Sequence, residues 1–275
     1  MLNRADLPPS RPAVMGILNV TPDSFSDGGL HFAPRDAVSA GLRMVGDGAD
    51  IVDVGGESTR PGAEPVPVEE ELRRVIPVVE ALASEGTIVS VDTMKAAVAR
   101  EALAAGARIV NDVTALRDPE MVEVVAAAQC TVCLMHMKGE PRTMQSNPEY
   151  VDVVAEVRDY LVDRARFAES RGIAPDRIWI DPGFGFGKTV RHNLLLLKHL
   201  DAFVATGYPV LIGVSRKSTI GKLLNPENPL PVEERYEGTL AAQVVAQTKG
   251  ARIIRTHDVK SAKRAAMITA AILDA

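Results

Sequence analysis

The stretch TIVSVDTMKAAVAREALAAGARIVNDV (residues 87–113) contains the repeating unit that decides the fold. Residues 87–93 form a near-continuous apolar run rich in β-branched residues, which is typical of a parallel strand covered on both faces. Residues 95–107 follow with the spacing of a helix, and residues 108–113 form the next strand-like run. A strand, a helix and a second strand in this order predict a parallel sheet.

Runs of the same kind recur along the whole chain. They occupy residues 14–20, 50–56, 87–93, 108–113, 131–137, 178–183, 209–215 and 252–259. A stretch with helical spacing follows each run, and eight such units predict an α/β fold of the (β/α)8 TIM-barrel class. We expect one domain at residues 14–275, preceded by an N-terminal extension at residues 1–13. A doubly wound open sheet remains the alternative, because periodicity alone does not show whether the sheet closes.

Composition and charge exclude several classes of partner. The chain has 275 residues, a formal net charge of -5 and 24% charged residues. A chain of this charge without a clustered basic face is not expected to bind nucleic acid or an anionic membrane. No run approaches the ~18 apolar residues of a membrane span, and the first residues lack the apolar core of a signal peptide. We therefore expect a cytoplasmic protein.

Cys130 and Cys133 have the CxxC spacing of a redox or metal pair. They lie in a strand-like run, however, and residues three apart on a strand face opposite sides. No second CxxC is present to complete a metal site. We expect both residues to be buried core cysteines.

Polar residues recur at the same end of the predicted strands. They are Asn19, Asp92, Asn111 with Asp112 beside it, Asp181, the group Arg216, Lys217 and Ser218, and the pair Arg255 and His257, with Thr59 and Arg60 just beyond the second strand. Any one of them would be explained by strand termination, since Asn and Asp favour turns. In a barrel, however, these ends meet at the C-terminal face, where active sites are built. The set as a whole predicts a functional pocket.

The mixture of side chains indicates the chemistry of the ligand. Two carboxylates and an amide match a flat heterocycle that carries N–H donors and a carbonyl group. Arg255, His257 and Asn19 suit an anionic group, and Mg2+ is the metal that combines oxygen ligands with phosphate oxygens and retained water. No spacing typical of a zinc site is present.

Two segments imitate other catalytic motifs. PGFGFGKT (182–189) resembles a phosphate-binding loop, but position 182 is Pro where that motif requires Gly. Its glycines are expected to let a loop turn tightly, with Phe184 or Phe186 covering the pocket. SRKS (215–218) lacks the His and Asp context of a serine nucleophile.

Several segments together resemble one known family, the dihydropteroate synthases. They are LNVTPDSFSDGG (18–29), DVGGESTRPGA (53–63), SVDTMKAAVA (90–99), RIVNDV (108–113), LMHMKGEPRTMQ (134–145), DPGFGFGKT (181–189), GVSRKS (213–218) and RTHDV (255–259). The resemblance extends from about residue 14 to the C-terminus in the family's order. It implies a pterin-binding catalytic barrel at 14–275 that acts as a transferase in folate biosynthesis. That reaction joins 6-hydroxymethyl-7,8-dihydropterin pyrophosphate to 4-aminobenzoate, giving 7,8-dihydropteroate and pyrophosphate.

The resemblance also implies roles for individual residues, Mg2+ as the cofactor and a homodimer. The residues implied for the pterin pyrophosphate are Thr59, Asp92, Asn111, Asp181, Lys217, Arg255 and His257, and Asn19 is implied for the metal. Those implied for 4-aminobenzoate are Arg60, Phe186, Lys217 and Ser218. Catalytic roles are implied for Asp27, Arg60, Lys217, Arg255 and His257. For Asp27 we hypothesise that the carboxylate stabilises the positive methylene group or orients the amine.

Two other functions fit a pterin-binding barrel. A pterin-dependent corrinoid methyltransferase would share Asp92, Asn111 and Asp181 but would not need a pyrophosphate or aminobenzoate site. A non-catalytic paralogue that only binds pterin would be expected to have degraded first and second loops, and here both are intact. GGESTRPG, SRKS and RTH favour the synthase.

Overall fold

The eight predicted strands form one closed sheet. The computed structural model describes residues 4–21, 34–58, 63–140, 143–146 and 148–275. The strands are β1 (Ala13–Asn19), β2 (Ile51–Gly55), β3 (Val89–Asp92), β4 (Ile109–Asp112), β5 (Thr131–Met135), β6 (Ile178–Asp181), β7 (Leu211–Ile212) and β8 (Ile253–Thr256). All pairings are parallel, in the order β6-β5-β4-β3-β2-β1-β8-β7.

A single isolated bridge closes the barrel between its two end strands. It pairs Ile180 of β6 with Val210, just before β7. The predicted (β/α)8 barrel is therefore confirmed, and the open-sheet alternative is wrong. Seven of the eight strands are shorter than the predicted runs, whereas β1 has the same length, and β7 covers only two residues of the predicted 209–215.

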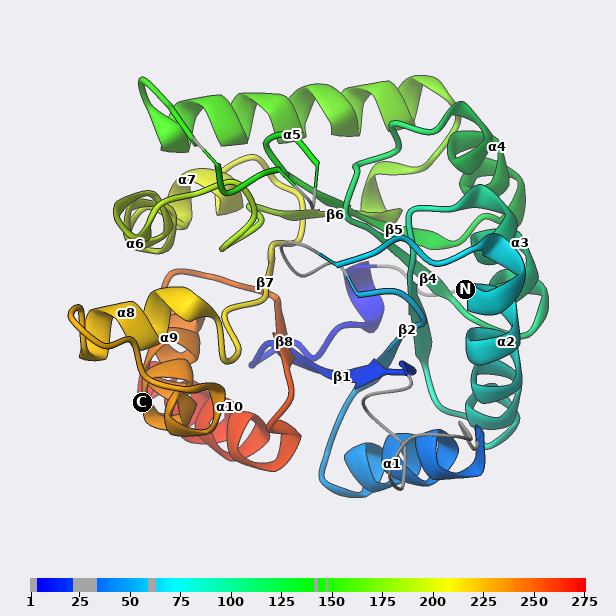
Figure 1. Cartoon of the computed structure of the whole chain (residues 1–275), viewed down its shortest axis with the longest axis horizontal. Coiled ribbons are helices and arrows are strands. Elements are labelled where there is room, and N and C mark those ends of the chain that lie inside the picture. Colours follow the sequence, from blue (N-terminus) through cyan, green and yellow to red (C-terminus); the bar gives the residue numbers. More distant parts are fainter. Residues whose placement is uncertain (1–3, 22–33, 59–62, 141–142, 147) are drawn as a thin grey trace.

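The helices form a ring around the strands (Figure 1). They are α1 (Pro34–Gly46), α2 (Val68–Ser84), α3 (Ala96–Ala104), α4 (Pro119–Ala128), α5 (Val153–Ser170), α6 (Val190–Lys198), α7 (Asp201–Val204), α8 (Ser218–Leu224), α9 (Tyr236–Thr248) and α10 (Val259–Leu273). Side chains start several of them: Asp118 accepts from Glu120 N, and Thr189 forms a capping box with His192. Such caps satisfy backbone N–H groups that have no partner within the helix.

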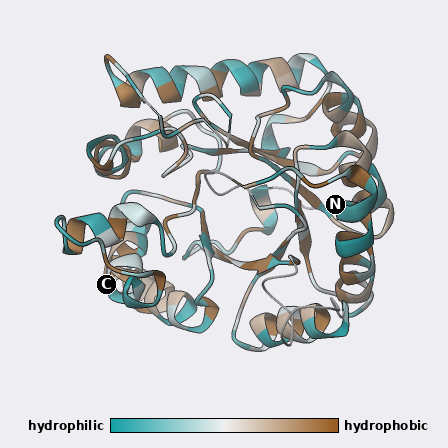
Figure 2. Cartoon of the chain, in the orientation of Figure 1, coloured by the Kyte–Doolittle hydropathy of each residue, from teal (hydrophilic) through white to brown (hydrophobic). Residues whose placement is uncertain are grey.

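Two apolar layers hold the barrel together. The outer layer lies between strands and helices, and Figure 2 shows the apolar strands surrounded by helices whose colours alternate between hydrophobic and hydrophilic. The inner layer fills the barrel with Met15, Ile51, Ile109, Trp179 and other strand residues. Because inward side chains pack in layers, the part of the barrel near the N-terminal ends of the strands is a core and not a channel.

The N-terminal segment covers the barrel at the N-terminal ends of the strands. Leu7 is 4% exposed and packs in the same cluster as the inward strand residues. Arg252 donates to the backbone oxygen of Pro8 at 2.8 Å, and Arg4 donates to that of Gly207 at 2.8 Å. Residues 4–12 are thus part of the packed structure.

The two cysteines are core residues, as predicted. Both are buried and free, on or next to β5. Burial raises the pKa of the Cys130 thiol to about 12 and that of Cys133 well above its ordinary value, which suppresses the reactive thiolate. Within the described residues, no helix has the length and apolar character needed to cross a membrane.

Candidate active site

An arginine and two aspartates connect three strands at the C-terminal end of the barrel. Arg255 of β8 donates through Nε to Asp53 Oδ2 and through Nη2 to Asp92 Oδ2, both at 2.6 Å. Asp53 lies on β2, and Asp92 is the last residue of β3. Burial alone would lower the pKa of Arg255, but Asp53 and Asp92 raise it above its ordinary value. The guanidinium is therefore a fixed positive charge on the floor of the site.

Asn111 joins this network from β4. Its Nδ2 donates to Asp53 Oδ2 at 3.0 Å, and its Cα pairs in register with that of Asp92. Both residues are buried, so their polar atoms have little access to water. Three of the sequence-predicted site residues thus meet around Asp53, which was not predicted.

Two carboxylate oxygens of the network have no hydrogen-bond partner among the described residues. They are Asp53 Oδ1 and Asp92 Oδ1, both buried. Unpaired buried acceptors are costly, and they are found where a ligand supplies the missing donor. Burial raises the pKa of Asp92 to about 7, with Arg255 acting in the opposite direction and Asp53 adding to the rise.

Asp181 and Lys217 have opposite charges that act on each other at the mouth. Asp181 ends β6, and its Oδ1 accepts from the backbone N–H of Gly183 at 2.7 Å. Burial raises the pKa of Asp181, while Lys217 lowers it. Burial lowers the pKa of Lys217 to about 8, although Asp181 favours its charged form. Opposite charges in this region match a ligand that has both donors and a carbonyl oxygen.

The loop after β6 supplies the aromatic wall. Lys217 Nζ donates to the backbone oxygen of Phe184 and lies 4.2 Å from the centre of the Phe186 ring. Phe186 is half-buried, whereas Phe184 is buried in the core. Of the two phenylalanines proposed from sequence, the structure therefore brings Phe186 to Lys217.

A buried lysine fixes the same loop from behind. Lys188 Nζ lies 2.9 Å from the backbone oxygen of Phe186, 3.0 Å from His136 Nδ1 and 3.2 Å from His136 O. Burial lowers the pKa of His136 to about 2, so its ring is neutral. The loop approaches β5 so closely that a Cβ on Gly183 would lie 1.9 Å from His136 O, at a φ of +68°. Only glycine fits this turn.

His257 and the segment after β7 complete the rim. His257 Nδ1 lies 2.9 Å from Ser215 Oγ, which also accepts from the His257 backbone N–H at 3.2 Å. Arg216 is held elsewhere, by a bidentate ion pair with Asp258. Ser218 is the exposed first residue of α8. Ser215 therefore orients the histidine rather than acting as a nucleophile.

The donor set fits Mg2+ in one specific way. Asn19 ends β1 and is half-buried at the mouth. Within the described residues, no group of three or more His, Cys, Asp or Glu side chains is placed to hold a metal ion. Mg2+ that keeps its waters and binds mainly through phosphate oxygens needs few protein ligands, and an amide oxygen is one of them.

The structure does not bring every sequence-predicted residue into the site. Asp27, Thr59 and Arg60 fall outside the described residues. Asp112 does not belong to the site: it accepts from Thr114 N at 2.8 Å and Leu116 N at 2.7 Å and so stabilises the turn after β4. Consecutive strand residues face opposite sides, which is why Asn111 points inward and Asp112 does not.

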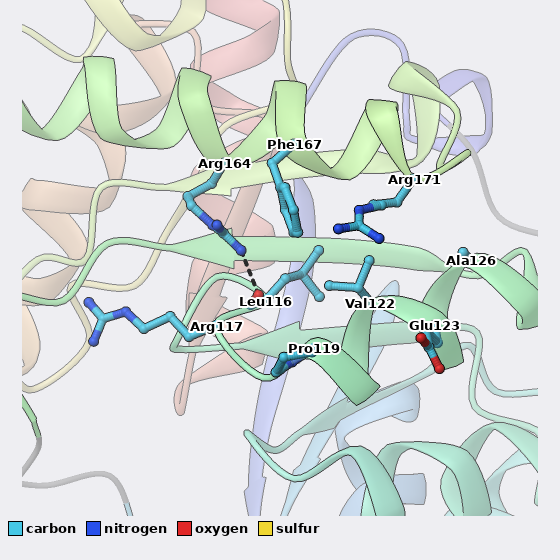
Figure 3. Close-up of a pocket in the computed structure, with 9 residues that line it drawn as sticks. All are labelled: Leu116, Arg117, Pro119, Val122, Glu123, Ala126, Arg164, Phe167 and Arg171. Atoms are coloured by element: carbon cyan, nitrogen blue, oxygen red, sulfur yellow. Dashed lines mark hydrogen bonds between the residues drawn. The ribbon is translucent and has the colours of Figure 1, made fainter.

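A surface cleft of about 320 Å3 lies away from this site, between α4 and α5 (Figure 3). Phe167 lines it beside Arg164 and Arg171, whose guanidinium carbons lie 4.3 and 5.2 Å from the ring centre. Arg164 donates to the backbone oxygens of Ala115 and Leu116. These two residues have positive φ angles of 55° and 59°. The cleft arginine therefore stabilises a left-handed turn.

Comparisons with known proteins identify the family of the chain. Residues 15–257 match the family described as "Pterin binding enzyme". The chain is 52% identical over 267 residues to dihydropteroate synthase of Escherichia coli K12, covering 97% of this chain and 93% of the relative.

Solved structures give the same result. A Xanthomonas albilineans dihydropteroate synthase with 4-aminobenzoic acid has a TM-score of 0.90 and 50% identity, covering 96% of this chain and 94% of that one. A structure of the enzyme from the same organism in complex with 7,8-dihydropteroate has a TM-score of 0.86 and 47% identity, covering 96% and 95% of the two chains. The chain belongs to the dihydropteroate synthase family of pterin-binding enzymes.

Proposed function

We propose that this barrel condenses 6-hydroxymethyl-7,8-dihydropterin pyrophosphate with 4-aminobenzoate and releases pyrophosphate. The observation that carries the proposal is the buried polar set at one mouth, in which Asp92 and Asp181 face Lys217 and Arg255. Relatives named for this activity match nearly the whole chain.

The pterin ring is assigned to the deep end of the mouth. The unpaired Asp92 Oδ1 is an acceptor for a ring N–H group, and Asp181 is a second acceptor. Lys217 is the donor for the ring carbonyl. Because Asp92 and Asp181 are buried, each hydrogen bond from the ring to them is made in a poorly screened environment, where a mismatched ring would leave a carboxylate unpaired.

The leaving group is assigned to the β8 and β1 side of the mouth. Arg255 and His257 lie two residues apart on the β8 side, and Asn19 ends the neighbouring β1. Asn19 would be a ligand of Mg2+, which when bound would neutralise part of the pyrophosphate charge. Positive groups fixed before the reaction stabilise the charge that develops on the departing oxygen without reorganising.

The reaction then needs little acid–base help from the protein. The C–O bond between the pterin methylene and pyrophosphate breaks as ring nitrogens supply electron density, and the amine nitrogen forms the new C–N bond. The amine proton is lost to solvent or to the departing pyrophosphate. The Phe186 ring, held against Lys217, supplies an apolar wall for the aromatic amine. Asp27, Arg60 and Ser218 are proposed to complete this second subsite, and Thr59 is proposed to bind the pterin pyrophosphate.

We also propose a homodimer formed through the α8–α10 side of the barrel. Large apolar side chains are exposed on this side: Leu223, Leu224, Val245, Met267, Ile268, Ile272 and Leu273. α9 packs against both α8 and α10, so the side chains belong to neighbouring helices. Exposed apolar side chains gathered on neighbouring helices are typical of a subunit interface.

Release of pyrophosphate tests the function directly. We expect release only when the pterin pyrophosphate, 4-aminobenzoate and Mg2+ are all present, with 7,8-dihydropteroate formed in equal amount. Chelation of the metal should stop turnover, and added Mg2+ should restore it. Pyrophosphate release that does not depend on 4-aminobenzoate would show a hydrolase and contradict the proposal.

A further inference from the structure

We propose that Asp53 is a positioning residue of the site for the pterin pyrophosphate, where it holds Asn111 in the orientation that receives the ring and Arg255 in the orientation that receives the leaving group. The inference rests on the proposed function of the site. Asp53 does not need to touch the substrate itself, because it acts through two side chains that line the mouth. The geometry of these three residues, on β2, β4 and β8, carries the argument.

Asp53 lies at the boundary between core and site. Its side chain is 0% exposed, and Ile51, two residues earlier on the same face, belongs to the apolar inner layer of the barrel. One oxygen, Oδ2, accepts from both Arg255 Nε and Asn111 Nδ2. The carboxylate on β2 is thus shared by a cation from β8 and an amide from β4, which lie on opposite sides of β2 in the sheet.

The contact with Asn111 decides which end of its amide faces the ligand. A carboxylate that pairs with a guanidinium is only an acceptor, so the amide must present its NH2 group to Asp53. Asn111 Oδ1 is then directed away from Asp53 as an acceptor. Without Asp53, the two orientations of the Asn111 amide would be closer in free energy. A fraction of the enzyme molecules would then present the NH2 group, and not Oδ1, to the pterin.

The contact with Arg255 decides where its charge sits. The guanidinium is planar, and its Nε and Nη2 are occupied by two different carboxylates. Two ion pairs in one plane fix the group more strongly than one. Asp53 therefore prevents Arg255 from moving fully to Asp92, whose second oxygen is left for the ligand.

Asp53 also affects the titration of Asp92. The charged groups around Asp92 are Arg255 on β8, Asp53 on β2, Glu71 on α2 and Asp112 on β4, and Lys217 lies across the mouth. Burial raises the pKa of Asp92, Arg255 lowers it, and Asp53 raises it again. Removal of the Asp53 charge should lower the pKa of Asp92 by ending this repulsion and by leaving Arg255 to pair with Asp92 alone.

A purely structural role explains less. The inner layer beneath Asp53 is apolar, and a hydrophobic residue there would avoid the cost of burying a charge. Its Oδ1 has no partner among the described residues, so the network does not satisfy all of Asp53. What distinguishes Asp53 from other buried polar residues is that its Oδ2 holds two side chains that line the mouth.

Two substitutions separate the charge from the orientation. Asp53→Asn removes the charge but keeps an oxygen that accepts from Asn111, whereas Asp53→Ala removes both. Ser90→Ala is the matched control, because Ser90 is equally buried, pairs in register with Asp53 and has a hydroxyl without a partner among the described residues. Thermal melting with and without ligand shows which variants fold.

Calorimetric binding of 6-hydroxymethylpterin from pH 5 to pH 9 is the measurement. For Asp53→Asn we expect the acid midpoint of binding to move to lower pH than in the unsubstituted enzyme, while Ser90→Ala leaves it in place. The ligand's own titration cancels in this comparison. The charges that act most on Asp181 are Lys217, Lys188 and Arg255, so a shifted midpoint reports on Asp92.

For Asp53→Ala we expect the affinity to fall at least ~10-fold at the optimum pH. In the double variant with Asp53→Ala and Asn111→Ala, the factor by which the affinity falls should be smaller than the product of the two single factors, because both substitutions act through one amide. An unchanged midpoint in Asp53→Asn, or full additivity with Asn111→Ala, would overturn the proposal. If the unsubstituted enzyme binds no pterin, the proposed function itself fails, which is a different result.

Discussion

At the scale of single residues, the buried Asp92 and the half-buried Lys217 should set the pH range of pterin binding. Burial raises the pKa of Asp92 to about 7 and lowers that of Lys217 to about 8. Binding that uses the Asp92 carboxylate as acceptor is lost as the pH falls through about 7, and binding that uses the Lys217 ammonium is lost as it rises through about 8. We expect a narrow bell-shaped dependence of affinity on pH, measured by calorimetry. Lys217→Met should weaken binding and remove the alkaline decline; an alkaline decline that survives this substitution would exclude Lys217 as its source.

The double ion pair of Arg255 predicts a second residue-scale effect. Arg255→Ala leaves the carboxylates of Asp53 and Asp92 buried without their cation, so unfolding free energy should fall by ~3–5 kcal/mol. Pterin affinity should fall together with pyrophosphate affinity, because the floor of the pterin pocket is disturbed as well. Urea denaturation and calorimetry provide the two measurements. Arg216→Ala is the control, since its ion pair with Asp258 is partly exposed and should contribute less than ~1 kcal/mol. Equal stability of both variants would show that the Arg255 pairs are not structurally important.

At the scale of elements, the loop after β6 depends on a glycine that has no room for a side chain. Gly183 and Gly172 both have positive φ, but a Cβ on Gly183 would strike His136 O, whereas one on Gly172 would have nothing within 4 Å. Gly172→Ala should therefore lower the free energy of unfolding only by the conformational strain, ~1 kcal/mol. Gly183→Ala should cost more and also weaken pterin binding, because the Gly183 N–H donates to Asp181. Denaturant midpoints and pterin affinities of the two variants measure these effects. An equal loss of stability in both variants would mean that the loop moves away from His136 without a penalty.

The elements also show what sequence can and cannot predict. Runs of β-branched residues located all eight strands, since a parallel strand covered on both faces must be apolar. Closure was left open, because one bridge at Ile180 decides it and no pattern encodes that bridge. Alternation along a strand separates Asn111 from Asp112 and would have placed Asp53 on the face of Ile51 and Gly55. Asp53 was missed because it lies in the middle of a strand, where only the distant Arg255 reveals its role.

At the scale of the whole molecule, the exposed apolar side of α8–α10 predicts a dimer that a single charge should break. Ile268 is 64% exposed on α10, among other exposed apolar side chains. Ile268→Glu would bury a charge at the interface and should shift the mass measured by light scattering from two subunits to one. Val45→Glu is the control, because Val45 is exposed on α1, outside this surface. A monomeric unsubstituted enzyme, or a dimer that tolerates Ile268→Glu, would place the interface elsewhere.

The closure between β6 and β7 gives the barrel a local opening route. Among the described residues, the bridge from Ile180 to Val210 is the only backbone pairing between these strands, so the amides there should exchange with solvent at lower free energy than those of β1 and β2. Asp181 lies on one side of this junction and Lys217 follows the strand on the other. A pterin held by both residues would therefore link the two edges of the sheet. Bound ligand should slow amide exchange at 178–181 and 209–215 more than in the rest of the barrel, because the substrate would link two strands that the backbone links at one bridge. Uniform protection along the chain would show that the ligand stabilises the fold only globally.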